Sequence, residues 1–138
     1  MPRLAYILQS SENQKRHVCI DATNESTILQ FLQEDPARLK KFQQIVTIIL
    51  ENIRNTELYD KEEIDRATKG VTAMKLFKGG QNIRLYCKEQ SNESGTFYVI
   101  VAELLRKKKD QKVKGKTKTL IQKVAGYEYQ IKERPTNG

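Results

Sequence analysis

The chain has 138 residues, of which 38% are hydrophobic and 30% charged, and its formal net charge is +8 at pH 7. This length predicts a single domain over residues 1–138. No stretch approaches the roughly 18 apolar residues of a membrane span, and residues 1–14 lack the apolar core of a signal peptide, so we expect a cytoplasmic protein without a membrane partner.

The first half of the chain predicts a hairpin and two helices. Residues 3–9 and 16–22 read as two strands, which form an N-terminal strand extension over 1–23. A short helix follows, capped by Thr23 or Asn24. Asp35 and Pro36 then start a firmer helix that runs to about residue 55, because the carboxylate can accept from unpaired N–H groups and proline suits the first helical position. The two helices carry apolar residues at helical spacing, namely Ile28, Leu29, Phe31 and Leu32 in the first and Leu39, Phe42, Ile45, Val46, Ile49, Leu50 and Ile53 in the second.

The apolar stripe of the second helix has two interpretations. Its three- and four-residue spacing is typical of a helix packed on a core. The same spacing also describes a seam for a second copy or a partner helix, which leaves a dimer or hetero-oligomer open.

The second half predicts a small helix, three strands and a terminal helix. Asp60 and Glu63 resemble a capping pair and Gly70 suits a left-handed C-terminal position, which frames a helix over 61–69. Runs 71–78, 81–90 and 96–105 alternate as an antiparallel meander. Leu120, Val124, Tyr127 and Ile131 recur at helical spacing, and residues 135–138 should form a frayed tail. The fold class is therefore α+β, with N-terminal helices packed on a twisted antiparallel sheet and a C-terminal helix.

The Gly79-Gly80 pair predicts a two-residue hairpin between the first two strands of the meander, because both glycines accept positive φ. This turn fixes a register. If Lys78 lies opposite Gln81, one face of the strand pair is apolar and sets Leu76 opposite Ile83, Met74 opposite Leu85 and Thr72 opposite Cys87. The other face sets Lys75 opposite Arg84 and Ala73 opposite Tyr86, with Lys88 further along. Facing cations repel each other unless an anion lies between them or the side chains splay into solvent.

A basic run over 106–118 contains eight lysines and arginines and one acid, Asp110. Within 103–123 there are nine basic and two acidic residues, a net +7 of the chain's +8. This concentration favours an anionic partner such as nucleic acid over uniform solvation. A flexible, solvated segment is the alternative interpretation.

The two cysteines and the one histidine do not form a metal site by their spacing. Cys19 and Cys87 lie in alternating strand patterns without a second cysteine or a histidine nearby, so we expect reduced core thiols. His17 stands alone, which argues against zinc ligation and histidine-based catalysis. We therefore expect neither a metal nor a cofactor.

The order of helices, meander and basic segment resembles the RelE/ParE superfamily of toxins from bacterial type II toxin–antitoxin systems, over roughly residues 36–131. The resemblance rests on Met74-Lys75-Leu76, Asn82-Ile83-Arg84-Leu85-Tyr86, Tyr98-Val99-Ile100-Val101-Ala102-Glu103-Leu104 and Lys107-Lys108-Lys109-Asp110-Gln111-Lys112. The last segment is similar to the lysine-rich phrase after the final core strand of the HigB-like branch, with Asp110 where threonine is common. The N-terminal strands depart from the shorter members.

The resemblance implies a metal-independent, ribosome-dependent mRNA endoribonuclease that inhibits translation, with the ribosome, mRNA and a cognate antitoxin as partners. It implies catalytic roles for Arg84 at the scissile phosphate, Lys75 at the nucleophile, and Arg106 or Lys108 at the leaving oxygen. The remaining expected RNA-binding residues are Tyr86, Lys88, Lys107, Lys109, Lys112 and Lys114. Two other functions stay open, namely a ParE-like DNA gyrase inhibitor without nuclease activity and a non-enzymatic nucleic-acid-binding regulatory domain.

Overall fold

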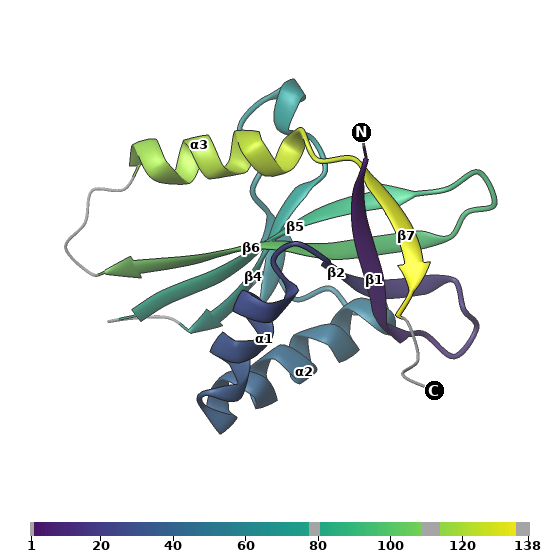
Figure 1. Cartoon of the computed structure of the whole chain (residues 1–138), viewed down its shortest axis with the longest axis horizontal. Helices are drawn as coiled ribbons and strands as arrows, with labels where there is room; N and C mark the ends of the chain where they lie inside the picture. Colours follow the sequence, from purple (N-terminus) through teal and green to yellow (C-terminus); the bar gives the residue numbers. More distant parts are fainter. Residues whose placement is uncertain (1, 78–80, 109–113, 135–138) are drawn as a thin grey trace.

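The computed structural model describes residues 2–77, 81–108 and 114–134, which fold into one mixed sheet with helices on both faces (Figure 1). The elements in chain order are β1 (Arg3–Ser10), β2 (Arg16–Asp21), α1 (Glu25–Gln33), α2 (Pro36–Leu50), β3 (Tyr59–Lys61), a 3-10 turn η1 (Arg66–Thr68), β4 (Val71–Phe77), β5 (Gln81–Ser91), β6 (Phe97–Lys108), α3 (Lys114–Ala125) and β7 (Tyr129–Glu133). The seven strands lie in the order β3-β4-β5-β6-β2-β1-β7.

The expected α+β class, with N-terminal helices on a sheet and a C-terminal helix, is confirmed, but the sheet is not purely antiparallel. The N-terminal hairpin β1–β2 forms as expected and joins the meander through a parallel pairing of β2 with β6. β7 then pairs with β1, again in parallel. Long connections supply both parallel pairings, because parallel neighbours need a crossover rather than a tight turn.

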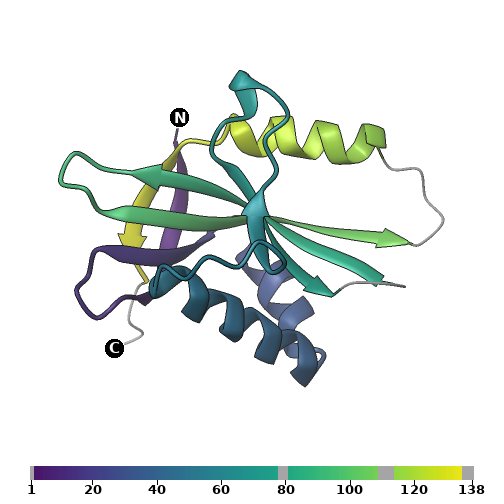
Figure 2. The same cartoon turned by 180° about the vertical axis from the view of Figure 1, so that it is seen from behind.

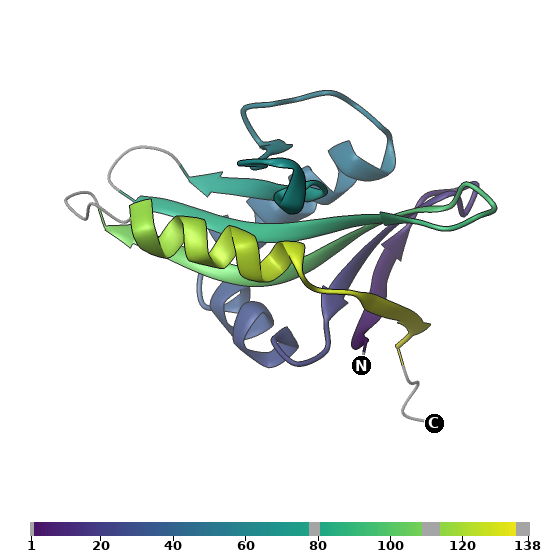
Figure 3. The ribbon, with the colours of Figure 1, turned by 90° about the horizontal axis from the view of Figure 1, so that it is seen from above.

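The helices divide the core into two layers, one on each face of the sheet. Helices α1 and α2 cover one face and α3 lies across the other, as Figures 1 and 3 show from two directions. The first layer includes Ile28, Phe31, Leu32, Ile45, Val46, Met74, Leu85 and Val101, and the second includes Cys19, Ala73, Tyr86, Ile100, Ala102, Ile121, Val124 and Tyr129. The apolar face of α2 therefore packs on the core, as the first of its two interpretations predicts.

Helix α2 begins as predicted but ends earlier. The Asp35 side chain accepts from the N–H of Ala37, and Pro36 is the first helical residue. The helix ends at Leu50 rather than near residue 55, because Asn52 adopts a positive φ of 56°. The N–H of Asn52 then donates to Ile49 and the N–H of Ile53 to Ile48, the paired bonds of a Schellman motif.

The predicted helix over 61–69 is wrong. Residues 59–61 pair with β4 as strand β3, and a single 3-10 turn follows at 66–68. The capping box is formed by Asp65 and Thr68 rather than by Asp60 and Glu63. Gly70 has the expected positive φ of 94°, and its N–H donates to the Glu63 carboxylate. Backbone pairing with β4 gives residues 59–61 more hydrogen bonds than an isolated helical turn would.

The predicted C-terminal helix is shifted toward the N-terminus. Helix α3 ends at Ala125, and after Gly126 the chain becomes extended and forms β7. Tyr127, Tyr129 and Ile131 then follow a two-residue alternation against the sheet, so the pattern that includes positions 127 and 131 belongs to a strand. The tail over 135–138 lies outside the described residues.

The meander forms at the expected places, and most of its predicted register is confirmed. Lys75 pairs with Arg84, Met74 with Leu85, Ala73 with Tyr86, and Thr72 with Cys87. A bulge after Lys75 shifts the next pair, so Phe77 rather than Leu76 lies opposite Ile83. The turn at Gly79-Gly80 and the predicted pairing of Lys78 with Gln81 fall outside the described residues.

Candidate nucleic-acid interface

Lys75 and Arg84 lie directly opposite each other on β4 and β5, as the sequence predicts. Each cation is held by an acceptor from this chain. Arg84 Nη1 donates to Oε1 of Glu62 at 2.7 Å, and Lys75 Nζ donates to the carbonyl of Thr56 at 3.2 Å. The acceptors come from the segment between α2 and η1, which explains how the sheet tolerates two facing cations.

Glu62 was not identified by the sequence analysis, although it is the counter-ion of the main catalytic candidate. Its side chain is 19% exposed and that of Arg84 is 26% exposed, so the pair is largely withdrawn from water. The two residues are 22 positions apart, Glu62 in the connection between β3 and η1 and Arg84 within β5, and no local pattern links them. The Glu62 carboxylate accepts a hydrogen bond from the Arg84 guanidinium as a phosphate oxygen would, because both are anionic acceptors.

Tyr86, the predicted base-stacking residue, is fully buried in the layer beneath α3. Its ring cannot stack on a base in this arrangement. Its hydroxyl is also buried and makes no hydrogen bond within the described part of the chain. Burial first, and then the nearby Glu62 carboxylate, raises the pKa of the phenol, whereas Arg84 lowers it. Tyr86 is thus a neutral, packed neighbour of the Arg84–Glu62 pair.

Lys88 serves as a cap for helix α3. Its Nζ donates to the carbonyl of Ala125, the last residue of the helix, at 2.5 Å. A cation at a helix C-terminus meets unpaired carbonyls and the negative end of the helix dipole. Burial lowers the pKa of Lys88 and the charge of Glu128 raises it. This contact engages the ammonium within the fold.

The basic run begins within strand β6, which extends beyond its predicted end at residue 105. Strand β6 continues to Lys108, and its last residues Arg106, Lys107 and Lys108 pair with Ile83, Asn82 and Gln81 of β5. The backbone of Arg106 therefore lies one residue from the position opposite Arg84. Lys114 begins α3. Lys109 and Lys112 lie outside the described residues.

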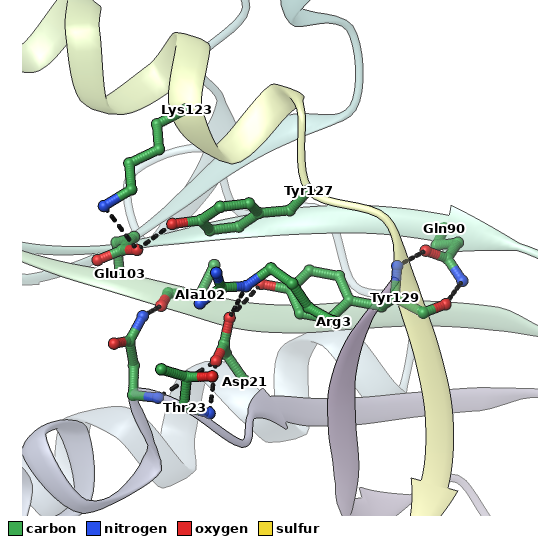
Figure 4. A network of polar contacts seen from close by, with 10 residues as sticks. Arg3, Asp21, Thr23, Gln90, Ala102, Glu103, Lys123, Tyr127 and Tyr129 are labelled. Carbon is green, nitrogen blue, oxygen red and sulfur yellow. Dashed lines mark hydrogen bonds and ion pairs between the residues drawn. The ribbon is translucent and has the colours of Figure 1, made fainter. Parts of the chain in front are cut away.

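A buried polar network joins the start of the chain to its end, on the same face as α3 (Figure 4). Asp21 is fully buried, and its carboxylate accepts from Arg3 Nε at 2.8 Å and from the Tyr129 hydroxyl at 2.7 Å. The N–H groups of Thr23 and Asn24 donate to its other oxygen at the start of α1. Asp21 therefore fixes β1, β7 and α1 together, and no sequence motif indicated it.

A second part of this network ties α3 to the sheet. The Tyr127 hydroxyl donates to Glu103 on β6 at 2.5 Å, and Lys123 of α3 lies 3.8 Å from the same carboxylate (Figure 4). Arg3 lies over the Tyr127 ring, 4.0 Å from its centroid. Tyr127 therefore has a structural role, since its ring packs in the core and its hydroxyl is hydrogen-bonded.

Cys19 and Cys87 are buried free thiols, as predicted. His17 is 7% exposed, contacts the Ser10 hydroxyl and the Gln14 carbonyl, and stacks on Tyr98. Across the described ranges, no three histidine, cysteine or acidic residues gather in a way that could hold a metal ion. Among the same residues, no helix is both long and apolar enough to cross a membrane.

Comparisons with protein families, curated proteins and solved structures returned no match for this chain. The resemblance to RelE/ParE toxins therefore stays a prediction.

Proposed function

We propose that this chain is the toxin of a bacterial toxin–antitoxin pair and acts as a metal-independent, ribosome-dependent mRNA endoribonuclease. The observation that carries the proposal is the register that sets Lys75 opposite Arg84. The end of β6 lies beside this pair and leads into the basic run. Two cations on neighbouring strands, next to a cationic segment, could together bind a phosphodiester that displaces their acceptors within the chain.

The proposed reaction is an attack of an RNA 2′-oxygen on the adjacent phosphorus. The new O–P bond forms as the bond to the 5′-oxygen breaks, which leaves a 2′,3′-cyclic phosphate. The 2′-hydroxyl gives its proton to water, and the departing 5′-oxygen takes up a proton from water. Arg84 would stabilise the charge that grows on the nonbridging oxygens, because a fixed guanidinium binds it more strongly in the transition state. Lys75 would orient the nucleophile, and Arg106 or Lys108 would assist the leaving oxygen.

The ion pair between Arg84 and Glu62 sets a condition on this reaction. A phosphate can reach the guanidinium if it replaces the carboxylate, which would then move toward solvent. The ribosome and its mRNA would supply binding energy for this exchange through the basic run. The reaction places the protein in the cytoplasm, where a cognate antitoxin would cover the same cationic face.

Controlled expression without an antitoxin tests the proposal. We expect growth arrest with cleaved mRNA from the unaltered chain, and loss of both from Arg84→Ala at equal protein level. Arg54→Ala is the matched control, because Arg54 is exposed and lies outside the proposed site. Normal growth and intact mRNA with abundant, folded protein would remove the basis of the proposal. Intact mRNA with an induced DNA-damage response would favour the gyrase-inhibitor alternative.

A non-enzymatic nucleic-acid-binding domain is the second candidate, and the contacts of this face favour it. Arg84 and Lys75 are engaged by the chain itself, and Tyr86 and Lys88 are held beneath or against α3. In that case purified protein binds RNA with a steep salt dependence and without strand scission. Arg84→Ala would then lower affinity slightly instead of abolishing an activity.

A further inference from the structure

A separate cavity of about 510 Å³ lies where α2 ends above the sheet. Its floor is formed by side chains on the α2 face, including Arg16, Glu89 and Phe97, and so faces away from Tyr86. The connection over 51–58 leaves the end of α2 and arches out to β3 (Figures 2 and 3), and its residues 52–56 line the cavity. The volume falls within the range of small-molecule sites.

Arg16 provides a fixed cation on this floor. Its Nε donates to the carbonyl of Ile49 in the last turn of α2 at 2.7 Å, and its guanidinium lies 4.5 Å from the centroid of the Phe97 ring. These contacts hold the plane of the group. Its two terminal nitrogens make no ion pair or hydrogen bond within the described ranges, and a guanidinium fork of this kind matches a carboxylate.

Glu89 provides a fixed carboxyl group on the same floor. The hydroxyl of Tyr59 donates to its Oε2 at 2.9 Å, and Thr72 Oγ1 donates in turn to that hydroxyl at 2.8 Å. This chain orients the carboxyl group and leaves Oε1 without a partner in the described part of the molecule. Arg16 and Glu89 both line this cavity, so a small ligand within it can meet the two groups together.

The walls of the cavity combine apolar and charged groups. Ile48 and Ile53 line it, and Ile53 is 52% exposed, so it offers an apolar surface to a ligand. Arg54, Asp60 and Lys61 also contribute to the lining. Both signs of charge are therefore present beside an apolar surface.

We propose that this cavity binds a free α-amino acid with an apolar side chain. The α-carboxylate would pair with the Arg16 fork, the α-ammonium would donate to Glu89, and the side chain would cover Ile53. A ligand carrying only negative charge, such as phosphate, would bring its charge against Glu89 and Asp60. An uncharged apolar ligand would cover Arg16 and Glu89 without satisfying either group, which costs free energy. This inference does not rest on the proposed ribonuclease activity.

Isothermal titration calorimetry with the full chain tests the assignment. The probes are L-leucine and L-phenylalanine, with L-leucinamide lacking the carboxylate, N-acetyl-L-leucine lacking the ammonium, and inorganic phosphate. We expect saturable binding of a free amino acid and about tenfold weaker binding when either end is blocked, the usual effect of losing a charged hydrogen bond. No saturable binding of either amino acid, or equal binding of N-acetyl-L-leucine or phosphate, would overturn the proposal.

Variants locate the binding within the cavity. Arg16→Lys keeps the charge and removes the fork, Glu89→Gln keeps the shape and removes the charge, and each should weaken amino-acid binding by about tenfold. Glu93→Gln in the β5–β6 turn should leave it unchanged. Circular dichroism and a matching thermal midpoint establish that each variant is folded. Amino-acid binding that persists unaltered in both cavity variants would place the ligand elsewhere and refute the assignment.

Discussion

Arg84 and Glu62 form an ion pair of 2.7 Å that joins the central strand β5 to the connection between β3 and η1. The pair neutralises the cation that is best placed to bind a phosphate. A phosphate can therefore bind Arg84 only if it displaces the Glu62 carboxylate. The affinity of the proposed site for RNA should thus depend on Glu62.

The first prediction concerns that glutamate. Glu62→Gln should raise affinity for a single-stranded RNA oligonucleotide by about fivefold, because Arg84 no longer has a competing carboxylate. Its cost in stability should stay near 1 kcal/mol, since both side chains keep some contact with water. Fluorescence anisotropy at fixed salt measures the change. Glu63→Gln is the control, because Glu63 accepts from the backbone N–H of Gly70 and pairs with no arginine among the described residues. An equal gain there would contradict the specific role of Glu62.

The second prediction concerns Asp21. Asp21→Asn should lower the free energy of unfolding by about 3 kcal/mol, because an amide cannot satisfy Arg3, Tyr129 and two backbone donors together. Urea denaturation followed by circular dichroism measures the loss. Asp60→Asn, at the edge strand β3, should change it by less than about 1 kcal/mol. Similar small losses in both variants would argue against the network as the anchor of β1 and β7.

The third prediction concerns the pH dependence of stability through Glu89. Burial raises the pKa of this carboxyl group above its usual value of 4.5, although the Tyr59 hydrogen bond and nearby cations lower it. The folded state then holds more protons than the unfolded state, so the contribution of Glu89 to stability falls as pH rises from 4.5 through the folded pKa.

Glu89→Gln should remove this contribution, because an amide does not ionise and can still accept from Tyr59. The difference in unfolding free energy between variant and unaltered chain should become more favourable to the variant as the pH rises from about 4 to about 7. Urea titrations at several pH values give this difference. A difference that is constant with pH would mean that the carboxyl group titrates normally.

The fourth prediction concerns the two thiols. Cys19 and Cys87 are fully buried, and burial raises the pKa of Cys19 to about 12 and that of Cys87 further. Both should resist a thiol reagent such as Ellman's reagent at pH 8 in the folded protein and react completely in denaturant, because the thiolate is the reactive form. Rapid reaction of either thiol under native conditions would indicate local opening of the sheet.

The sequence predicted those helices and strands that are determined by residues close together in the chain. Asp35 and Pro36 set the start of α2, and alternation set the strands. The predicted pairing of Lys75 with Arg84 is present, but a bulge separates it from the turn on which that prediction rested. The concentration of positive charge after residue 105 is likewise a property of the sequence alone. These features depend on backbone geometry and side-chain period, which neighbouring residues determine.

The tertiary structure decided how those features are used. It ended α2 at Leu50 and turned the predicted last helix into α3 and β7, because the free backbone groups of the chain's end could pair with β1. It also paired the Glu62 carboxylate with Arg84, brought the Ala125 carbonyl to the Lys88 ammonium and packed helix α3 over Tyr86. The sequence identifies the charged and apolar groups that need a partner on folding. The partner lies in a distant segment of the chain, so only the three-dimensional packing determines which group it is.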